Sequence, residues 1–376
     1  MPSLGELFGK LNIKNRNTIN VLFCGGSRVG KTSVMAAMES NMLDRFPAGT
    51  ISLRLPNSGR LADNRLAKES KFLEDNDQNM TFYADERDTA NADKNEYRCQ
   101  VNLEGRAGLS LNFIDIPGEW FIDPKSESDL MQVMKSAQIL VVAVDSPHLM
   151  ENPEYQAEYG RYHNVFNRAP EVTRFIEKTL QGDNSPRLVL FVPVKCEVYR
   201  KGNMKRLLEC VHKGYKELIH ICEKANCAVA CTPCMTMGGL EFLNFVPRRE
   251  GFDPAGNRNT GELAKDENGR PLQDVMLDEN GVAHMTYVSE YIYLLNNNNR
   301  RYYAPMDCDQ PLDYILLFLF GVGKMRKKHI LSGIVNALFD LPDQKILDSC
   351  KSVVKPMIKT APDDGFEIIS DPYNMF

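Results

Sequence analysis

Short, continuous runs of apolar residues recur along the chain, and each one ends at a polar or turn-forming residue. The first, Ile19–Phe23, is interrupted by Asn20, and the others are Ile139–Val144, Leu188–Val194 and Ala228–Ala230. Stretches with helical periodicity lie between them, and Val34, Met38 and Met42 recur at every fourth position after the first run. Continuous apolar strands separated by helices are typical of a parallel sheet covered on both faces. The pattern predicts an α/β protein with a doubly wound, mainly parallel sheet.

One pair of strands is predicted to be antiparallel. Tyr97–Leu103 and Leu109–Ile114 read as strands on either side of Glu104-Gly105-Arg106, and the second strand leads into Asp115. The segment from 47 to 98 that precedes this hairpin is polar, charged and poor in periodicity. We expect a long loop or insertion there.

The pattern changes after Gly239. Asp266-Glu267-Asn268-Gly269 and Asp278-Glu279-Asn280-Gly281 lie twelve positions apart, and Asn-Gly favours a tight hairpin turn. A small β-meander is therefore predicted, continuing through Met285–Leu295. A calcium-binding loop does not fit, because oxygen-bearing side chains do not recur at the alternate positions such a loop needs.

The chain of 376 residues is long enough for two average domains or for one elaborated α/β domain. We predict a core domain from 1 to 240 with a polar insertion near 47–98. A β-rich insertion is expected from 241 to 308. A closing helix that begins near Pro311 and a helical tail are expected from 309 to 376.

The charge balance narrows the classes of partner. A formal net charge of −5 and a pI near 5.8 give no general attraction to nucleic acid or anionic lipid, so no nucleic-acid partner is expected. The basic run from 324 to 328 is read as a solvated helix end, although a local contact stays open. Residues 1–9 lack an export signal, and Tyr314–Val322 is too short to cross a bilayer. We expect a cytoplasmic protein without a membrane span.

Ten cysteines lie at irregular intervals, which favours reduced thiols in a cytoplasm. Cys231 and Cys234 have the spacing of two zinc ligands. No second pair of this kind and no paired histidines follow. A zinc site is therefore the less favoured reading.

A glycine-rich loop joins the first predicted strand to the first predicted helix. It reads Gly25-Gly26-Ser27-Arg28-Val29-Gly30-Lys31-Thr32 and fits G-x-x-x-x-G-K-[ST] at every position, with Ser33 next. Backbone N–H groups of such a loop surround phosphate oxygens, and the positive end of the helix faces them. The loop is predicted to bind the phosphates of a nucleotide, with Arg28 either on a phosphate or in solvent.

Side chains around this loop predict a magnesium site. Lys31 would reach the β- and γ-phosphates, and the Thr32 hydroxyl would ligate a magnesium ion that bridges them. Asp115 ends an apolar strand, where its carboxylate can hold the ion directly or through water. Gly118, three residues later, leaves its N–H free to meet the γ-phosphate.

The order of these signals resembles the translation-factor and Ras-like class of P-loop GTPases. The glycine loop is followed by Asp115-Ile116-Pro117-Gly118-Glu119-Trp120, by Val194-Lys195-Cys196-Glu197 and by Cys231-Thr232-Pro233-Cys234. Within the class, the first of these motifs resembles bacterial double-GTPase families. The resemblance spans about Asn20 to Gly239 and implies GTP or GDP and Mg²⁺ as ligands, with Lys195, Glu197 and Thr232 around the base. It also implies a protein partner that is itself a GTPase.

A mobile threonine closes over magnesium in this class, ahead of the strand that leads to Asp115. Thr89 is the candidate for this metal ligand and catalytic residue, with Thr81 second. Glu119 stands where fast members of the class carry a glutamine that orients the attacking water. We therefore expect hydrolysis that depends on Lys31, Thr89 and Glu119 and is slow.

Other departures concern the base. The class reads guanine with Asn/Thr-Lys-x-Asp, whereas this chain has Val194 and Glu197 at the first and last positions. Glutamate offers the same two acceptor oxygens one methylene farther out, so guanine stays favoured over adenine. Thr232-Pro233-Cys234 also departs from the usual Ser-Ala-Lys and is assigned by position only.

Three functions fit these observations. The first is a regulatory GTPase that hydrolyses GTP slowly and switches a protein partner. The second is a nucleotide-binding scaffold with little hydrolysis. An ATPase takes the place of the GTPase if the base is adenine. A metabolic kinase is the third, but it leaves Lys195 and Glu197 unexplained.

Overall fold

The computed structural model describes part of the chain. The described residues are 18–27, 29–42, 45–46, 49–54, 81–83, 95–150, 163–164, 166–183, 185–236, 238, 240–247, 273–277, 283–287, 289–295, 305–324 and 344–376.

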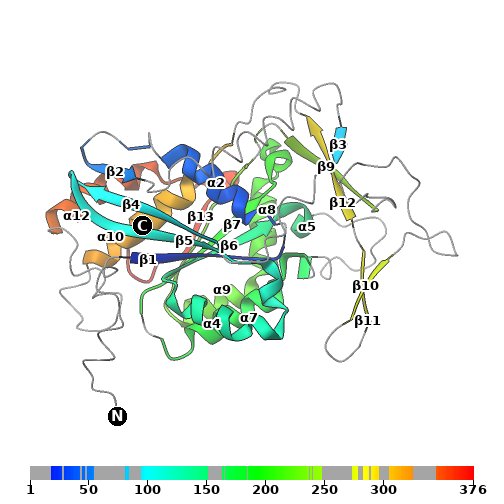
Figure 1. The fold of residues 1–376 in the computed structure, drawn as a ribbon. Helices are drawn as coiled ribbons and strands as arrows, with labels where there is room; N and C mark the ends of the chain where they lie inside the picture. The colour runs from blue at the N-terminus through cyan, green and yellow to red at the C-terminus, as the bar shows by residue number, and fades with distance from the viewer. Residues whose placement is uncertain are drawn as a thin grey trace, which may run out of the picture.

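An eight-stranded mixed sheet organises the described part of the chain (Figure 1). Its strands are β1 (Thr18–Cys24), β2 (Ile51–Arg54), β4 (Asn95–Leu103), β5 (Arg106–Asp115), β6 (Ile139–Asp145), β7 (Leu188–Val194), β8 (Ala228–Cys231) and β13 (Glu367–Ser370). The strand order is β13-β8-β7-β6-β1-β5-β4-β2. The five strands from β8 to β5 are parallel, and the others pair antiparallel at the two sides. The predicted doubly wound, mainly parallel architecture is confirmed.

Helices cover both faces of this sheet. One face packs against α2 (Lys31–Met42), α10 (Gln310–Lys324) and α12 (Gln344–Val354). The other packs against α4 (Glu127–Ser136), α7 (Ala169–Leu180), α8 (Met204–Gly214) and α9 (Lys216–Lys224). The remaining short elements are α5 (Ser146–Met150), η3 (Gly118–Phe121), η4 (Pro124–Ser126), η5 (Glu197–Lys201), η7 (Lys355–Met357) and η8 (Pro362–Asp364). Because the central strands run parallel, the loops that follow them lie together at the carboxyl ends of the strands. Ligands bind at this edge in open α/β sheets.

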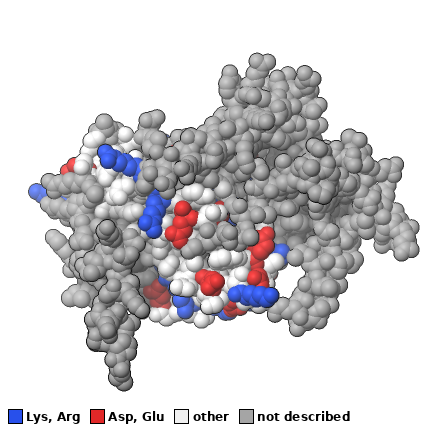
Figure 2. Space-filling model, in the orientation of Figure 1, with Lys and Arg blue, Asp and Glu red and all other residues white. Residues whose placement is uncertain are grey.

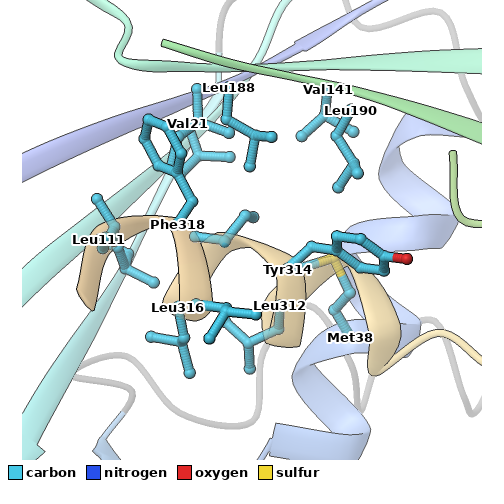
Figure 3. Close-up of a cluster of buried hydrophobic side chains, with 14 of the residues drawn as sticks. Val21, Met38, Leu111, Val141, Leu188, Leu190, Leu312, Tyr314, Leu316 and Phe318 are labelled. Atoms are coloured by element: carbon cyan, nitrogen blue, oxygen red, sulfur yellow. The ribbon is translucent and has the colours of Figure 1, made fainter. Parts of the chain in front are cut away.

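The first face is closed by α10, whose side chains are almost all buried. Phe318 and Tyr314 project from it toward Val21 and Leu190 of the central strands (Figure 3). A helix that is apolar on all sides is a core helix or a membrane span. Among the helices the structure describes, none is long and apolar enough to cross a bilayer.

The predicted hairpin is confirmed. Strands β4 and β5 pair from Asn95 opposite Asp115 to Leu103 opposite Arg106. Glu104 and Gly105 form the two-residue turn with φ of 48° and 75°. Two successive positive φ values are those of a type I′ turn, which is favoured in hairpins because its twist matches that of the two strands. The hairpin carries Asp115 to the same edge of the sheet as the end of β1.

Strands also occur where the sequence predicted a loop or a simple meander. The polar segment from 47 to 98 supplies β2, the start of β4 and β3 (Thr81–Tyr83). The later region contains β9 (Leu240–Pro247), β10 (Gln273–Leu277), β11 (Ala283–Tyr287) and β12 (Ser289–Leu295). Among the described strands of this later region, only β10 and β11 pair as neighbours in sequence, whereas β12 lies between β9 and β3 in a separate sheet. The meander prediction missed this pairing because β3 comes from 160 to 210 positions earlier in the chain.

Charged side chains of both signs are interspersed on the face of the molecule drawn in Figure 2. The described Lys and Arg residues there lie next to Asp and Glu residues, without a broad field of one sign. This mixture agrees with the small formal net charge of −5 for the whole chain.

Candidate functional site

The glycine loop lies between the end of β1 and the start of α2. Gly25 and Gly30 have φ of 138° and 107°, values that residues other than glycine rarely adopt. A Cβ atom at Gly25 would lie 2.8 Å from the carbonyl oxygen of Ala143 in β6. The loop thus needs glycine for backbone conformation and for close packing on the neighbouring strand. Gly26, Ser27, Val29, Thr32 and Ser33 occupy the predicted places in the loop and the first turn of the helix.

Lys31 is buried at the first position of α2, with 7% of its surface exposed. Its Nζ donates to the carbonyl oxygens of Gly25 at 3.1 Å and Gly26 at 2.8 Å. No ion pair of Lys31 occurs within the described residues. Burial lowers the pKa of its ammonium, while the nearby Asp115 and Glu119 act against this. A buried cation held only by carbonyl groups is a favourable place for an anion.

The start of α2 adds to this field. The first four N–H groups of a helix lack partners within it, and the helix dipole places partial positive charge at the same end. These groups and Lys31 face the glycine loop together. The loop, the lysine and the helix end have the chemistry of a phosphate site.

Thr32 and Asp115 bring two oxygens together beside Lys31. The Thr32 hydroxyl donates to Asp115 Oδ2 at 2.6 Å. Burial raises the pKa of Asp115, and Lys31 and Thr32 act against that rise. Neighbouring oxygens around a magnesium ion with bonds of about 2.1 Å lie about 3 Å apart. The two side chains therefore fit a shared magnesium ion, whose charge would favour the ionised carboxylate.

The turn after Asp115 packs directly on the glycine loop. A Cβ atom at Gly118 would lie 2.1 Å from the backbone nitrogen of Ser27 and 2.4 Å from the carbonyl carbon of Gly26. Only glycine fits at this contact. The hydroxyl of Ser27 donates to Glu119 Oε1 through a short hydrogen bond. Glu119 is thus tied to the loop, although it is exposed to solvent.

Lys195 follows β7 in a left-handed backbone conformation, with φ of 56°. Its Nζ donates to Asp145 Oδ2 at 2.6 Å, and Asp145 Oδ1 lies 2.8 Å from His148 Nδ1. Burial by itself would raise the pKa of Asp145, but His148 and Lys195 outweigh it and hold that pKa well below its ordinary value. This ion pair joins the ends of two adjacent strands, and no sequence pattern predicts it.

Glu197 and Thr232 lie at the same edge of the sheet, after β7 and β8. Glu197 is 6% exposed, and its Oε1 accepts from the backbone N–H of Gly238 at 3.3 Å. Thr232 is fully buried, its N–H donates to the carbonyl oxygen of Phe191 at 2.9 Å, and its Oγ1 has no hydrogen-bond partner in the described part of the chain. The carboxylate therefore points toward the loop that follows β8.

Sequence reasoning missed the segment before α7. A Cβ atom at Gly26 would lie 2.1 Å from the carbonyl oxygen of Phe166 and 3.4 Å from Cγ of Arg168. Residues 166–168 therefore cover one side of the glycine loop. Pro170 in the first turn of α7 marks the helix start in the sequence, but nothing local indicates contact with a loop 140 positions earlier.

Two predicted site residues, Arg28 and Thr89, lie outside the described residues. Thr81, the second candidate for the mobile threonine, lies in β3 and pairs there with Leu294 of β12.

All ten cysteines are free thiols. Cys231 and Cys234 belong to the hydrophobic clusters on opposite faces of the sheet. Across the described ranges, no group of three or more His, Cys, Asp or Glu side chains is arranged to hold a metal ion. The zinc reading of the cysteine spacing gains no support from this arrangement.

Comparison with known proteins gives a distant similarity of structure. No protein-family model matches the chain, and no curated protein matches it in sequence. Among solved structures, it is similar to the GTPase-like domain of S. cerevisiae Ski7 bound to GTP, with a TM-score of 0.36 and 13% identity over 63% of this chain. The same domain bound to GDP and inorganic phosphate gives a TM-score of 0.34, also with 13% identity, over 62% of this chain. The chain spans 46% of the length of each Ski7 chain.

Proposed function

We propose that this protein binds a nucleoside triphosphate with magnesium at the glycine loop, prefers guanine, and hydrolyses the γ-phosphate slowly. The observation that carries the proposal is Lys31, a buried cation whose partners among the described residues are only two carbonyl oxygens and which stands beside the Thr32–Asp115 pair. A phosphate would supply the missing negative charge.

The residues divide the work of binding. Backbone N–H groups of the loop and of the first turn of α2 hold phosphate oxygens, and Lys31 adds a charged hydrogen bond. Thr32 and Asp115 would hold Mg²⁺, which neutralises charge that develops on the phosphates. The N–H of Gly118 would meet the γ-phosphate, in keeping with the close packing of this residue on the loop.

Slow hydrolysis is supported by Glu119. A carboxylate only accepts hydrogen bonds, whereas the side-chain amide of glutamine both donates and accepts. Glu119 is also bonded to Ser27 and is not poised alone over the loop. This contact favours the second candidate, a nucleotide-binding scaffold with little hydrolysis, to the same degree.

The preference for guanine rests on Lys195 and Glu197. Guanine presents two donors to a carboxylate, whereas adenine presents a bare acceptor, and a site built for donors rejects a base without them. The low exposure of Glu197 strengthens the discrimination, because an unpaired buried acceptor is costly. If the base were adenine, the protein would be an ATPase.

We further propose a regulatory role toward a protein partner, which by resemblance is another GTPase, and a cytoplasmic location. A segment that changes order with the γ-phosphate is the usual way such proteins signal. Ten free thiols are in keeping with a reducing compartment.

The test is nucleotide binding by the full chain and by Lys31→Ala, measured by calorimetry with GTP, GDP and ATP in magnesium. Loss of a charged phosphate contact costs about 1.5–3 kcal/mol, so we expect triphosphate affinity to fall at least about tenfold. Lys178→Ala is the matched control, because this exposed lysine pairs with Glu127 on the far side of the sheet. Equal triphosphate affinity of the parent and Lys31→Ala contradicts the proposal, and equal affinity of the parent for GTP and ATP contradicts the guanine preference.

A further inference from the structure

The connection that leads into α7 lies on the glycine loop. Phe166 and Arg168 are the residues that an added Cβ at Gly26 would meet, at 2.1 Å and 3.4 Å. The distance to the Phe166 carbonyl oxygen leaves no room for a side chain on Gly26, and the distance to Arg168 Cγ is that of ordinary van der Waals contact. The backbone of the connection and the stem of Arg168 are therefore in direct contact with the phosphate site.

Three interactions fix this connection in place. The side chain of Asn167 accepts from the N–H of Asp145 at 2.7 Å and donates to the carbonyl oxygen of the same residue at 3.2 Å. The ring of His148 stacks on Phe166 with centroids 4.3 Å apart and planes 10° from parallel. The end of β6 thus holds the connection beside the loop.

Arg168 itself has an unusual backbone. Its φ of 53° and ψ of 36° are left-handed, and its carbonyl oxygen accepts from Val172 at 2.8 Å to start α7. This conformation costs a residue with a Cβ on the order of 1 kcal/mol. Such strain persists where surrounding contacts impose it, and it directs the Arg168 side chain past Gly26.

Among the residues that the structure describes, no carboxylate pairs with the guanidinium of Arg168. No hydrogen bond, ion pair or ring contact of this group occurs among the described residues, and Arg168 is only half-buried. Two other arginines of the core, Arg45 and Arg187, instead pair with Asp313 and Asp183. From Cγ beside Gly26, the guanidinium nitrogens extend up to four bonds farther, which brings the phosphate site within reach.

We propose that Arg168 is an arginine supplied by the chain itself to the terminal phosphates of the bound nucleotide. This inference rests on the proposed function. A guanidinium matches two phosphate oxygens at once and is always charged. In hydrolysis, water attacks the γ-phosphorus, the bond to the β-phosphate oxygen breaks, and the water proton passes to phosphate. Arg168 stabilises the charge that accumulates on the oxygens during this step.

Four variants of the full chain test the proposal. Arg168→Ala removes the guanidinium, and Arg168→Gly removes it while accepting the left-handed backbone, so strain is not the cause of any shared loss. Arg168→Lys keeps a charge without the planar fork. Arg174→Ala is the control, because this arginine lies one turn and a half along the same helix, over the ring of Phe175.

Two measurements are made for each variant: single-turnover hydrolysis of GTP with magnesium, and affinity for a fluorescent GTP analogue that resists hydrolysis against the matching GDP analogue. We expect Arg168→Ala and Arg168→Gly to lower the hydrolysis rate at least about tenfold. We also expect both to reduce the preference for triphosphate over diphosphate. Arg168→Lys should fall between them and the parent, and Arg174→Ala should match the parent.

The outcomes separate this inference from the proposed function. If the parent binds no nucleotide, or if Lys31→Ala binds as well as the parent, the proposed function itself fails. If the parent binds and Lys31→Ala does not, but the Arg168 variants match Arg174→Ala in both measurements, only the role of Arg168 is overturned. Because the affinity ratio needs no turnover, very slow hydrolysis still leaves a decisive result.

Discussion

At the scale of single residues, Thr32 and Asp115 show how a metal site is prepared by hydrogen bonding. The hydroxyl and the carboxylate come from helix α2 and strand β5, and their hydrogen bond of 2.6 Å sets both oxygens on one side of Lys31. Burial raises the pKa of Asp115, so its ionised form gains from any added positive charge. A magnesium ion and its phosphates are therefore expected to bind cooperatively here.

The first consequence concerns Asp115→Ala. We expect the magnesium concentration needed for half-maximal triphosphate binding to rise about tenfold or more, because loss of a supporting ligand commonly costs 10–100-fold in metal affinity. A magnesium titration at fixed fluorescent nucleotide measures the midpoint. Asp129→Ala is the control, since Asp129 is exposed on α4. The same midpoint for Asp115→Ala and the parent would remove Asp115 from the site.

Residue-level prediction from sequence succeeded where contacts are local. The glycine loop is contiguous, so its spacing alone indicated the turn and the start of the helix. The pairs Lys195–Asp145 and Arg168–Gly26 join positions that are 50 and 142 residues apart, and no local pattern encodes them. The left-handed φ values of Lys195 and Arg168 could not be predicted either, because lysine and arginine rarely adopt that conformation.

At the scale of elements, the connection between α5 and α7 is held by buried polar groups. Asn167 Nδ2 lies 2.9 Å from His163 Nδ1, which must therefore accept the hydrogen bond as a neutral ring. Asp145 and His148 also face this cluster. Burial lowers the pKa of His163 to about 4 from an ordinary value of 6.5. The anchoring of the connection thus depends on an uncharged imidazole.

This arrangement predicts loss of stability in mild acid. Between pH 6.5 and about 4 the unfolded chain binds a proton at His163 that the folded chain does not, so the free energy of unfolding falls as the pH is lowered. A difference of 6.5 minus about 4 in pKa corresponds to on the order of 3 kcal/mol. Denaturant unfolding at several pH values measures it.

His163→Gln supplies the control, because its side-chain oxygen can accept from Asn167 without titrating. We expect a shallower dependence on pH for this variant across the same window. His220→Gln, at an exposed position on α9, should keep the slope of the parent. A parent and a His163→Gln protein with identical slopes would show that His163 does not carry the effect.

Element prediction followed burial. The central strands β6, β7 and β8 are continuously apolar because both of their faces are covered, and β1 is apolar apart from Thr18 and Asn20. The sequence therefore predicted all four. The edge strands β2, β3 and β13 were not predicted. They have only 4, 3 and 4 residues, and β2 and β13 are partly exposed, so neither length nor alternation distinguishes them from loop.

At the scale of the whole molecule, the C-terminal part completes the fold that the N-terminal part begins. Helix α10 covers the face of the sheet next to α2, and β13 extends the sheet beyond β8. The hydroxyl of Tyr314 donates to the carbonyl oxygen of Lys359 at 2.6 Å, and Arg45 pairs with both Asp309 and Asp313. Segments more than 250 positions apart are thereby joined in one core.

Phe318 lies at the centre of this contact, and its truncation measures how much the contact contributes to the free energy of unfolding. The side chain is 1% exposed and projects from α10 toward the central strands (Figure 3). Truncation of a buried phenylalanine costs about 3–5 kcal/mol, because the removed contacts leave a cavity. We expect Phe318→Ala to lower the free energy of unfolding by that amount, measured in denaturant by both fluorescence and circular dichroism. Ile122→Ala is the control at a 37% exposed apolar position, where the change should stay within about 0.5 kcal/mol.

The two probes decide whether the described part of the chain unfolds as one unit. Since α10 shares its core with α2 and β1, loss of Phe318 should shift both probes together and should weaken nucleotide binding only at denaturant concentrations where the protein begins to unfold. Separate transitions would mean that the C-terminal helices dock on a sheet that is stable without them. In that case the glycine loop would keep its nucleotide affinity after α10 has been lost.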